Sequence, residues 1–227
     1  MKIRPTLEEA KQIMEKGNYG VIPISTEIYS DSTTPIEVLR RLKVVSRHVY
    51  LLESAEVDKK WGRYSFLGYD PVMSVSCYNG QVTIKTSMLT QNIQDNPRQY
   101  IREIVEENRS PQLEYLPSFT GGLVGYFSYD YIKYSEPALK LDAADEEGFQ
   151  DVDLMLFDKV IAFDNYRQKI VLIANMKTED LETAYHKAVM ELENMKALVE
   201  REEKQPISPL RLLSDFEPLF DETQYCD

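Results

Sequence analysis

The chain has few of the residues that covalent and metal-based chemistry requires. Its 227 residues include two cysteines, Cys77 and Cys226, and two histidines, His48 and His186. The cysteines show neither the pattern of a disulfide framework nor the spacing of a zinc site. Each histidine stands alone, and a lone histidine in a segment such as SRHVYLLES is more often structural than catalytic. The sequence therefore gives no support for Ser-His-Asp or Cys-His catalysis.

Positive charge is also scarce. The chain has 38 acidic residues against 26 Lys and Arg, which gives a formal net charge of −12. Such a surface repels phosphate backbones and anionic lipid, and no Lys/Arg cluster interleaved with aromatic residues offsets the repulsion. We therefore expect no nucleic acid and no membrane among the partners.

Long hydrophobic runs are missing as well. The apolar segment KIVLIANM (Lys169–Met176) is much shorter than the roughly 20 residues that a membrane-spanning helix needs. Residues 1–20 contain TLEEAKQIMEKG and lack the apolar stretch of a secretion signal. We therefore expect a cytoplasmic protein.

Hydrophobic residues nevertheless make up 43% of the chain, which is enough for a globular core, and helix signals occur at four places. Thr6 and Glu9 form a capping-box pattern ahead of an apolar helical face. Thr34 is the expected cap of a second helix, TPIEVLRRLK, and a third is expected around PRQYIREIVEEN. The fourth is a long helix whose apolar residues recur at intervals of three and four: Leu181, Tyr185, Ala188, Leu192, Met195 and Val199.

Strand signals lie between the helices. VYLLES is expected to form a strand because it is rich in β-branched and apolar residues. PVMSVSCYNGQVTIKT alternates on both sides of Asn79-Gly80, a pair typical of a tight hairpin turn. The segment LMLFDKVIAFDNYRQKIVLIANM predicts a second hairpin that turns at Asp164–Arg167, whereas the polar stretch Thr86–Asn96 is expected to be a loop.

Strands and helices mix without regular βαβ alternation. This pattern favours an α+β fold with largely antiparallel sheets packed together and flanked by helices. Residues 1–205 are expected to form one domain, and residues 206–227 a linker and the start of a further domain. Asp221 and Gln224 resemble a helix start with six residues to the end, whereas an isolated helix needs roughly 12–15. We therefore expect the natural chain to continue.

The stretch LLESAEVDKKWGRYSFLGYDP is the best candidate for a binding site. Glu53 and Ser54 stand where a strand ends, so their side chains can reach a crevice beside the sheet. A carboxylate accepts hydrogen bonds from the ammonium group of a free amino acid, and Arg63, Tyr64 and Ser65 add polar contacts. A solvated strand end followed by a turn explains the same residues equally well, so residue types alone leave both interpretations open.

Two motifs in order carry a family resemblance. LLESAEVDKKWGRYSFLGYDP and the later GGLVGYFSYDYIKY, together with FDETQYCD at the end, closely resemble the N-terminal region of anthranilate synthase component I. The resemblance covers essentially the whole chain. It implies a full-length lyase that converts chorismate and ammonia from glutamine to anthranilate and pyruvate in tryptophan biosynthesis, with feedback inhibition by L-tryptophan.

The resemblance also implies partners and a cofactor. They are a glutamine amidotransferase subunit (component II), the chain's own C-terminal chorismate-binding domain, and Mg²⁺ in the full-length enzyme. The family's catalytic and metal-binding residues follow FDETQYCD, so no catalytic residue, metal ligand or cofactor is expected in this chain, and no turnover by it alone.

The family's LLES motif lines its tryptophan pocket, and the return strand lies nearby. The positions that match in this sequence are Leu52, Glu53, Ser54, Arg63, Tyr64 and Ser65. The family's pocket also takes residues from an NPSPY-like segment, which this sequence lacks. We therefore expect a regulatory domain that binds tryptophan weakly by itself.

Two other interpretations remain open. The large subunit of aminodeoxychorismate synthase, in the folate pathway, shares the architecture, although the complete LLES with GRYSFLG favours the tryptophan enzyme. A stand-alone amino-acid-binding module would fit if the chain ended naturally.

Overall fold

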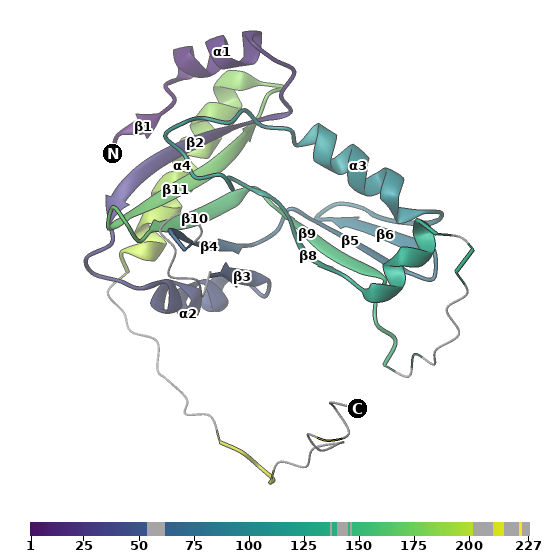
Figure 1. Cartoon of the computed structure of the whole chain (residues 1–227). Coiled ribbons are helices and arrows are strands. Elements are labelled where there is room, and N and C mark those ends of the chain that lie inside the picture. Colours follow the sequence, from purple (N-terminus) through teal and green to yellow (C-terminus); the bar gives the residue numbers. More distant parts are fainter. Residues whose placement is uncertain are drawn as a thin grey trace.

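The computed structural model describes residues 1–53, 62–136, 138–139, 145, 147–201, 211–215 and 223. Two antiparallel sheets, joined where β9 leads into β10, form the body of the molecule (Figure 1). The strands are β1 (Ile3–Arg4), β2 (Val21–Tyr29), β3 (Val49–Leu52), β4 (Tyr64–Tyr69), β5 (Met73–Tyr78), β6 (Gln81–Thr86), β7 (Thr90–Gln94), β8 (Gly122–Phe127), β9 (Val152–Phe157), β10 (Lys159–Asp164) and β11 (Lys169–Lys177). The helices are α1 (Leu7–Glu15), α2 (Pro35–Val45), α3 (Pro97–Glu107), the 3₁₀ helix η1 (Tyr129–Tyr134) and α4 (Leu181–Val199).

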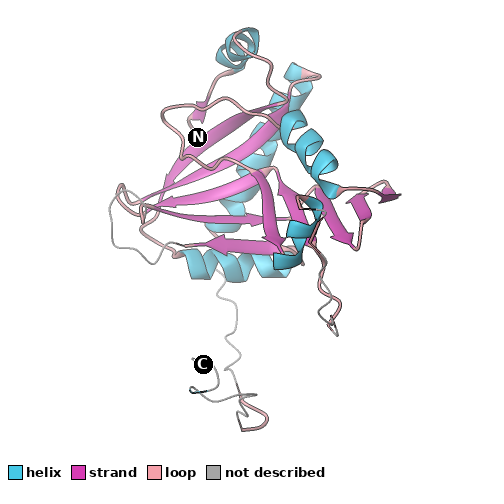
Figure 2. Cartoon of the chain, turned by 45° about the vertical axis from the view of Figure 1, so that its right-hand side comes forward, coloured by secondary structure: helices cyan, strands magenta, loops and turns pink. Residues whose placement is uncertain are grey.

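The larger sheet has six strands in the order β1-β2-β11-β10-β4-β3. Helix α4 runs behind these strands and α2 lies along their lower edge (Figure 2). Between the helices and the sheet is a core of apolar side chains with little or no solvent exposure. Its largest fully buried members are Ile22, Ile24, Leu42, Leu67, Ile161, Ile170, Leu172, Leu192 and Met195.

The opposite face of this sheet has no helix over its centre, and we call it the helix-free face. Val160, Ala162 and Ile173 are buried there. Leu116 and Phe119, from the segment between α3 and β8, pack over them. The cover on this face is therefore irregular chain rather than helix.

The smaller sheet has five strands in the order β7-β6-β5-β9-β8. Helix α3 contributes Ile104 to its core, and Tyr131 and Tyr134 of η1 pack against the same cluster. Only Asp158 separates β9 from β10, so one nearly continuous segment supplies a strand to each sheet.

The α+β fold is confirmed, as are the four helices and the hairpin at Asn79-Gly80. Glu9 N donates to Thr6 Oγ1 at 3.3 Å while Thr6 N donates to Glu9 Oε2 at 2.8 Å, which completes the capping box of α1. Asn79 and Gly80 have φ angles of 48° and 81°, the positive values that a tight hairpin turn requires. Asp221 and Gln224 lie outside the described residues.

Two strand predictions were wrong in part. The stretch Thr86–Asn96 is not all loop, because β7 pairs with β6 through Lys85 and Thr90. It is a polar edge strand, which has no hydrophobic pattern because no core lies against it. The expected long hairpin is also divided: β10 and β11 do pair, but β9 belongs to the other sheet.

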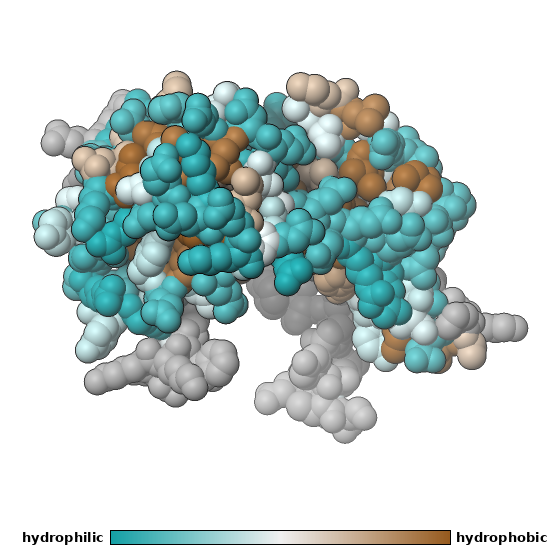
Figure 3. All heavy atoms as spheres, turned by 90° about the horizontal axis from the view of Figure 1, so that it is seen from above, coloured by the Kyte–Doolittle hydropathy of each residue, from teal (hydrophilic) through white to brown (hydrophobic). Residues whose placement is uncertain are grey.

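Seen from above, the surface is largely hydrophilic, with separate hydrophobic patches on both halves of the molecule (Figure 3). Within the part of the chain that the structure describes, no helix combines the length and the apolar character needed to cross a bilayer.

Candidate functional site

The predicted binding residues lie at one end of the β3–β4 ladder. β3 is an edge strand, and its last residue, Leu52, is 46% exposed and pairs with Phe66 of β4. Glu53 follows at once, is exposed, and forms no hydrogen bond or ion pair with another described residue. Ser54 lies outside the described residues. The structure therefore leaves the Glu53 carboxylate available to solvent or to a ligand.

Arg63 lies directly before β4, and two hydrogen bonds fix its side chain. Its Nε donates to Asp164 Oδ1 at 3.0 Å and its Nη2 donates to Asp164 Oδ2 at 2.6 Å. Its guanidinium also lies 4.8 Å from the ring centroid of Tyr64. A bidentate pair of this kind fixes the plane of the guanidinium. Arg63 is therefore preorganised, but its charge is already matched by a protein carboxylate.

Asp164 is the buried partner in this pair, with 3% of its surface exposed. Burial acts to raise the pKa of Asp164, but the hydrogen bonds from Arg63 and from the Arg167 N–H outweigh burial and lower it. Burial raises the pKa of Tyr64, and the neighbouring Asp164 carboxylate adds to the effect. At neutral pH the site thus holds an ionised aspartate next to a neutral phenol.

Ser65 does not join Arg63 and Tyr64. Side chains alternate along a strand, and Leu67 of β4 lies in the core under the helices. Ser65 has the same parity, is 4% exposed, and its Oγ accepts a hydrogen bond from Asn165 Nδ2 at 3.3 Å. It therefore points to the helix side of the sheet, whereas Tyr64 and Phe66 point to the helix-free face.

Arg63 and Tyr64 line a cavity of about 1130 Å³ on the helix-free face. Among the described residues, its lining contains five basic and three acidic ones. This is the reverse of the balance in the whole chain, which has 26 Lys and Arg against 38 acids. They are Lys2, Arg4, Arg63, Arg167 and Lys169 against Glu27, Glu114 and Asp164. Such a lining favours a ligand with a carboxylate.

Aromatic rings form an apolar wall beside the same ladder. Tyr50, two residues before Leu52, packs edge-to-face on Phe157 with ring centroids 4.8 Å apart. Phe66 packs on Phe119 at 5.5 Å in the same manner. A Cβ on Gly68 would lie 2.2 Å from the Tyr50 ring, so glycine is required there for this packing. The wall suits an aromatic ligand.

Asp164 was missed by sequence reasoning, which treated it only as the first residue of a turn. It lies 101 residues from Arg63 in the chain, and no spacing connects the two. Among the described residues, no group of three or more His, Cys, Asp or Glu side chains is placed to hold a metal ion.

Comparison with known proteins decides the family. The family model for chorismate binding enzymes matches residues 47–227, most of the chain. The chain belongs to the chorismate binding enzyme family. The match includes every predicted binding residue, from Leu52 to Ser65.

Named relatives of this chain agree with the family assignment. The chain is 38% identical over 201 residues to anthranilate synthase component 1 of Acinetobacter calcoaceticus, covering 86% of this chain and 40% of that protein. The corresponding protein of Acetivibrio thermocellus is 37% identical, with 82% and 37% covered. A crystal structure of anthranilate synthase component I from Streptococcus pneumoniae TIGR4 matches with a TM-score of 0.50 and 25% identity, covering 87% of this chain and 42% of that one.

The resemblance to anthranilate synthase component I is thereby confirmed. The chain spans about two fifths of the length of the curated relatives it matches.

Proposed function

We propose that the chain is the N-terminal, tryptophan-sensing part of an anthranilate synthase component I. The whole protein would act in the cytoplasm and convert chorismate and ammonia, supplied from glutamine by component II, to anthranilate and pyruvate. The main support is the agreement of relatives at 38% and 37% identity, which carry this name and align along most of the chain.

The tryptophan site in this proposal is the end of the β3–β4 ladder. The exposed Glu53 carboxylate would accept the ligand's ammonium group, with Ser54 beside it. Leu52 and the aromatic wall at Phe66 and Tyr50 would contact the indole ring. The observation that carries this assignment is a carboxylate that has no hydrogen bond or ion pair with any described residue and follows an exposed leucine near aromatic rings.

Turnover would belong to the rest of the protein. Mg²⁺ and chorismate would be bound by its C-terminal chorismate-binding domain, and residues 1–227 would be inactive alone. Tryptophan on this domain would favour an arrangement of the whole enzyme that binds chorismate poorly, for which a coupling free energy of about 1–3 kcal/mol between the sites is sufficient.

The experiment is a tryptophan inhibition assay on the full-length enzyme carrying Glu53→Ala, with Ser54→Phe as a second variant. Removing a charge-assisted hydrogen bond costs about 1.5–3 kcal/mol, so the inhibition constant should rise at least about tenfold while kcat changes little. Glu193 is a glutamate on the exposed side of α4, and Glu193→Ala is the matched control. Tryptophan should inhibit the enzyme carrying this variant as it inhibits the unmodified enzyme. Loss of turnover with normal inhibition in either site variant would refute the assignment.

The product identifies the enzyme. Anthranilate formation from chorismate supports the proposal, whereas aminodeoxychorismate formation would move the chain to the folate pathway. Calorimetry on residues 1–227 adds a second measure. If half of the roughly 8 kcal/mol of a micromolar ligand is lost without the rest of the enzyme, the dissociation constant for tryptophan becomes about millimolar. Micromolar binding would instead favour a stand-alone amino-acid-binding module.

A further inference from the structure

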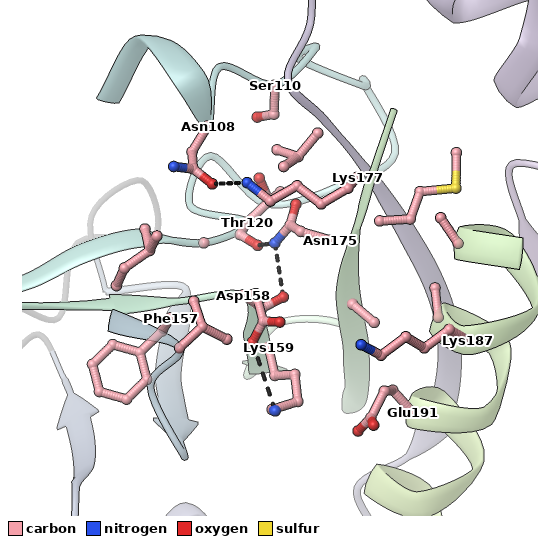
Figure 4. A pocket seen from close by; sticks show the side chains of 18 of the residues that line it. Asn108, Ser110, Thr120, Phe157, Asp158, Lys159, Asn175, Lys177, Lys187 and Glu191 are labelled. Carbon is pink, nitrogen blue, oxygen red and sulfur yellow. Dashed lines mark hydrogen bonds and ion pairs between the residues drawn. The ribbon is translucent and has the colours of Figure 1, made fainter. Parts of the chain in front are cut away.

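A second cavity, of about 440 Å³, lies where the two sheets meet helix α4 (Figure 4). Its walls come from the junction of β9 and β10, the end of β11, the segment after α3, and the first turns of α4. None of the described residues that line it also lines the cavity at Arg63 and Tyr64. The volume is within the range of small-molecule sites, which is roughly 300–1,000 Å³.

A buried ammonium group faces this cavity with hydrogen-bonding capacity to spare. The Lys159 side chain is 10% exposed, and its Nζ lies 3.4 Å from Asp70 Oδ2 and 3.6 Å from Asp158 Oδ1. The Lys133–Asp151 pair elsewhere in the molecule closes to 2.6 Å. An ammonium group has three N–H donors, and both of these contacts are long. Burying such a cation is costly, and the Asp70 and Asp158 carboxylates offset only part of that cost because both contacts are long.

Helix α4 presents one group of each charge to the same space. Lys187 and Glu191 are one helical turn apart, so their side chains lie on the same face of the helix. Both line the cavity, and Figure 4 shows them projecting from α4 opposite Lys159. Neither forms a hydrogen bond or ion pair with another residue that the structure describes.

The floor of the cavity is built in advance. Asn175 Nδ2 donates to Thr120 O at 2.6 Å and to Asp158 O at 3.0 Å, which ties the segment before β8 to the junction of β9 and β10. A Cβ on Gly121 would lie 2.5 Å from the same Nδ2 atom, so glycine is needed for this contact. The site therefore does not have to be assembled by its ligand.

Apolar residues complete the lining. Val72, Leu156, Met176, Ala184 and Ala188 line the same cavity as the charged groups. We infer that this cavity binds an α-amino acid with an apolar side chain. Its carboxylate would contact Lys159 and Lys187, its ammonium group would contact Glu191, and its side chain would lie on the apolar wall. This site is separate from the proposed tryptophan site at Glu53.

The binding test uses the 227-residue chain and calorimetry with L-phenylalanine and L-leucine as probes. Two analogues of phenylalanine each lack one charge: 3-phenylpropanoate has no ammonium group and 2-phenylethylamine has no carboxylate. At least one of the amino acids should bind, and phenylalanine should bind at least about tenfold more tightly than either analogue, since each charged contact contributes about 1.5 kcal/mol or more. No binding of either amino acid, or equal binding of 3-phenylpropanoate, would overturn the inference.

Variants locate the site. Lys187→Ala and Glu191→Gln should each weaken amino-acid binding about tenfold or more. Lys187 is exposed and Glu191 is half-buried, so neither variant removes a core side chain and both should fold. Glu193 is on the same helix but outside the cavity, and Glu193→Gln is the matched control. This variant should bind the amino acids as tightly as the unmodified chain. Glu53→Ala should also bind normally. Binding lost in Glu53→Ala and kept in Lys187→Ala and Glu191→Gln would assign it to the tryptophan site and refute this inference, without affecting the proposed function.

Discussion

The two sheets are stabilised by different means. Among the described residues, 17 buried ones form one apolar cluster on the helix side of the six-stranded sheet, whereas the five-stranded sheet has a cluster of seven. Hydrophobic stabilisation follows the apolar area buried, so the larger sheet relies mainly on packing against α4, α2 and α1.

The smaller sheet adds a buried polar network. Asp151 is 4% exposed, and Lys133 Nζ and Tyr134 Oη each donate to it at 2.6 Å. Asn79 N donates to the same carboxylate at 2.7 Å, which ties the β5–β6 turn to η1. Burial, and next the hydrogen bond to Asp151, raise the pKa of Tyr134, so the phenol remains a donor at neutral pH. In the smaller sheet, whose apolar core is small, hydrogen bonds and an ion pair to Asp151 thus help to fix the turn and η1 in place.

The largest expected effect is in the packed sheet. Leu172 is fully buried, and Leu172→Ala should lower the free energy of unfolding by about 3–4 kcal/mol because a cavity remains. Leu154→Ala, at a 3% exposed leucine in the smaller sheet, is the matched variant and should cost only about 2 kcal/mol. Urea denaturation measures both, with Met190→Ala at an exposed site of α4 as a control. Equal losses of unfolding free energy at Leu172 and Leu154 would show that the two sheets do not differ in how much they rely on apolar packing.

A middle-sized effect is expected for the polar network. Asp151→Asn removes the charge opposite Lys133, whose side chain is 26% exposed, so we expect a loss of about 2 kcal/mol, less than for a fully buried pair. Hydrogen exchange should accelerate in β5, β6 and η1 while β11 stays protected. Asp153→Asn, whose side chain makes no hydrogen bond or ion pair with described residues, is the control. Uniform acceleration in both sheets would show that the network stabilises the molecule globally.

The smallest effect concerns the Arg63–Asp164 pair on the larger sheet. The pKa of Asp164 is lowered in the folded state, so the pair stabilises the protein above the unfolded-state pKa of about 4 and loses this effect as the pH falls through the folded-state value. Asp164→Asn should therefore cost about 1 kcal/mol at pH 7, because Arg63 is partly exposed, and less at pH 2. Urea titrations at both pH values measure it, with exposed Asp31→Asn as the control. A cost as large at pH 2 as at pH 7 would contradict an ionic origin.

The helices were predictable because their signals are local. The Thr6 capping box and the three-and-four spacing in α4 depend on neighbouring residues alone, and both were confirmed. Sheet membership is a tertiary property. Nothing local distinguishes β9 from β10, yet they pair with β5 and β4 in different sheets.

The candidate site divides in the same manner. Ser65 was predicted to lie with Tyr64, although alternation in β4 could have separated them, because Ser65 has the parity of Leu67, a core residue. The contact of Arg63 with Asp164 joins positions 101 residues apart, and the cavity at Lys159 and Lys187 joins a strand to a helix. Long-range contacts of this kind depend on the whole fold, so the local sequence does not predict them.

The one-residue link at Asp158 has a mechanical consequence. Its carbonyl accepts hydrogen bonds from both the backbone N and the side-chain Nδ2 of Asn175, at 2.9 Å and 3.0 Å. The link between the sheets is therefore short and is also hydrogen-bonded to β11. A one-residue link held in this way leaves little freedom for the two sheets to tilt independently. We therefore expect the sheets to move largely as one unit, so that a displacement of the smaller sheet also changes the position of the larger one.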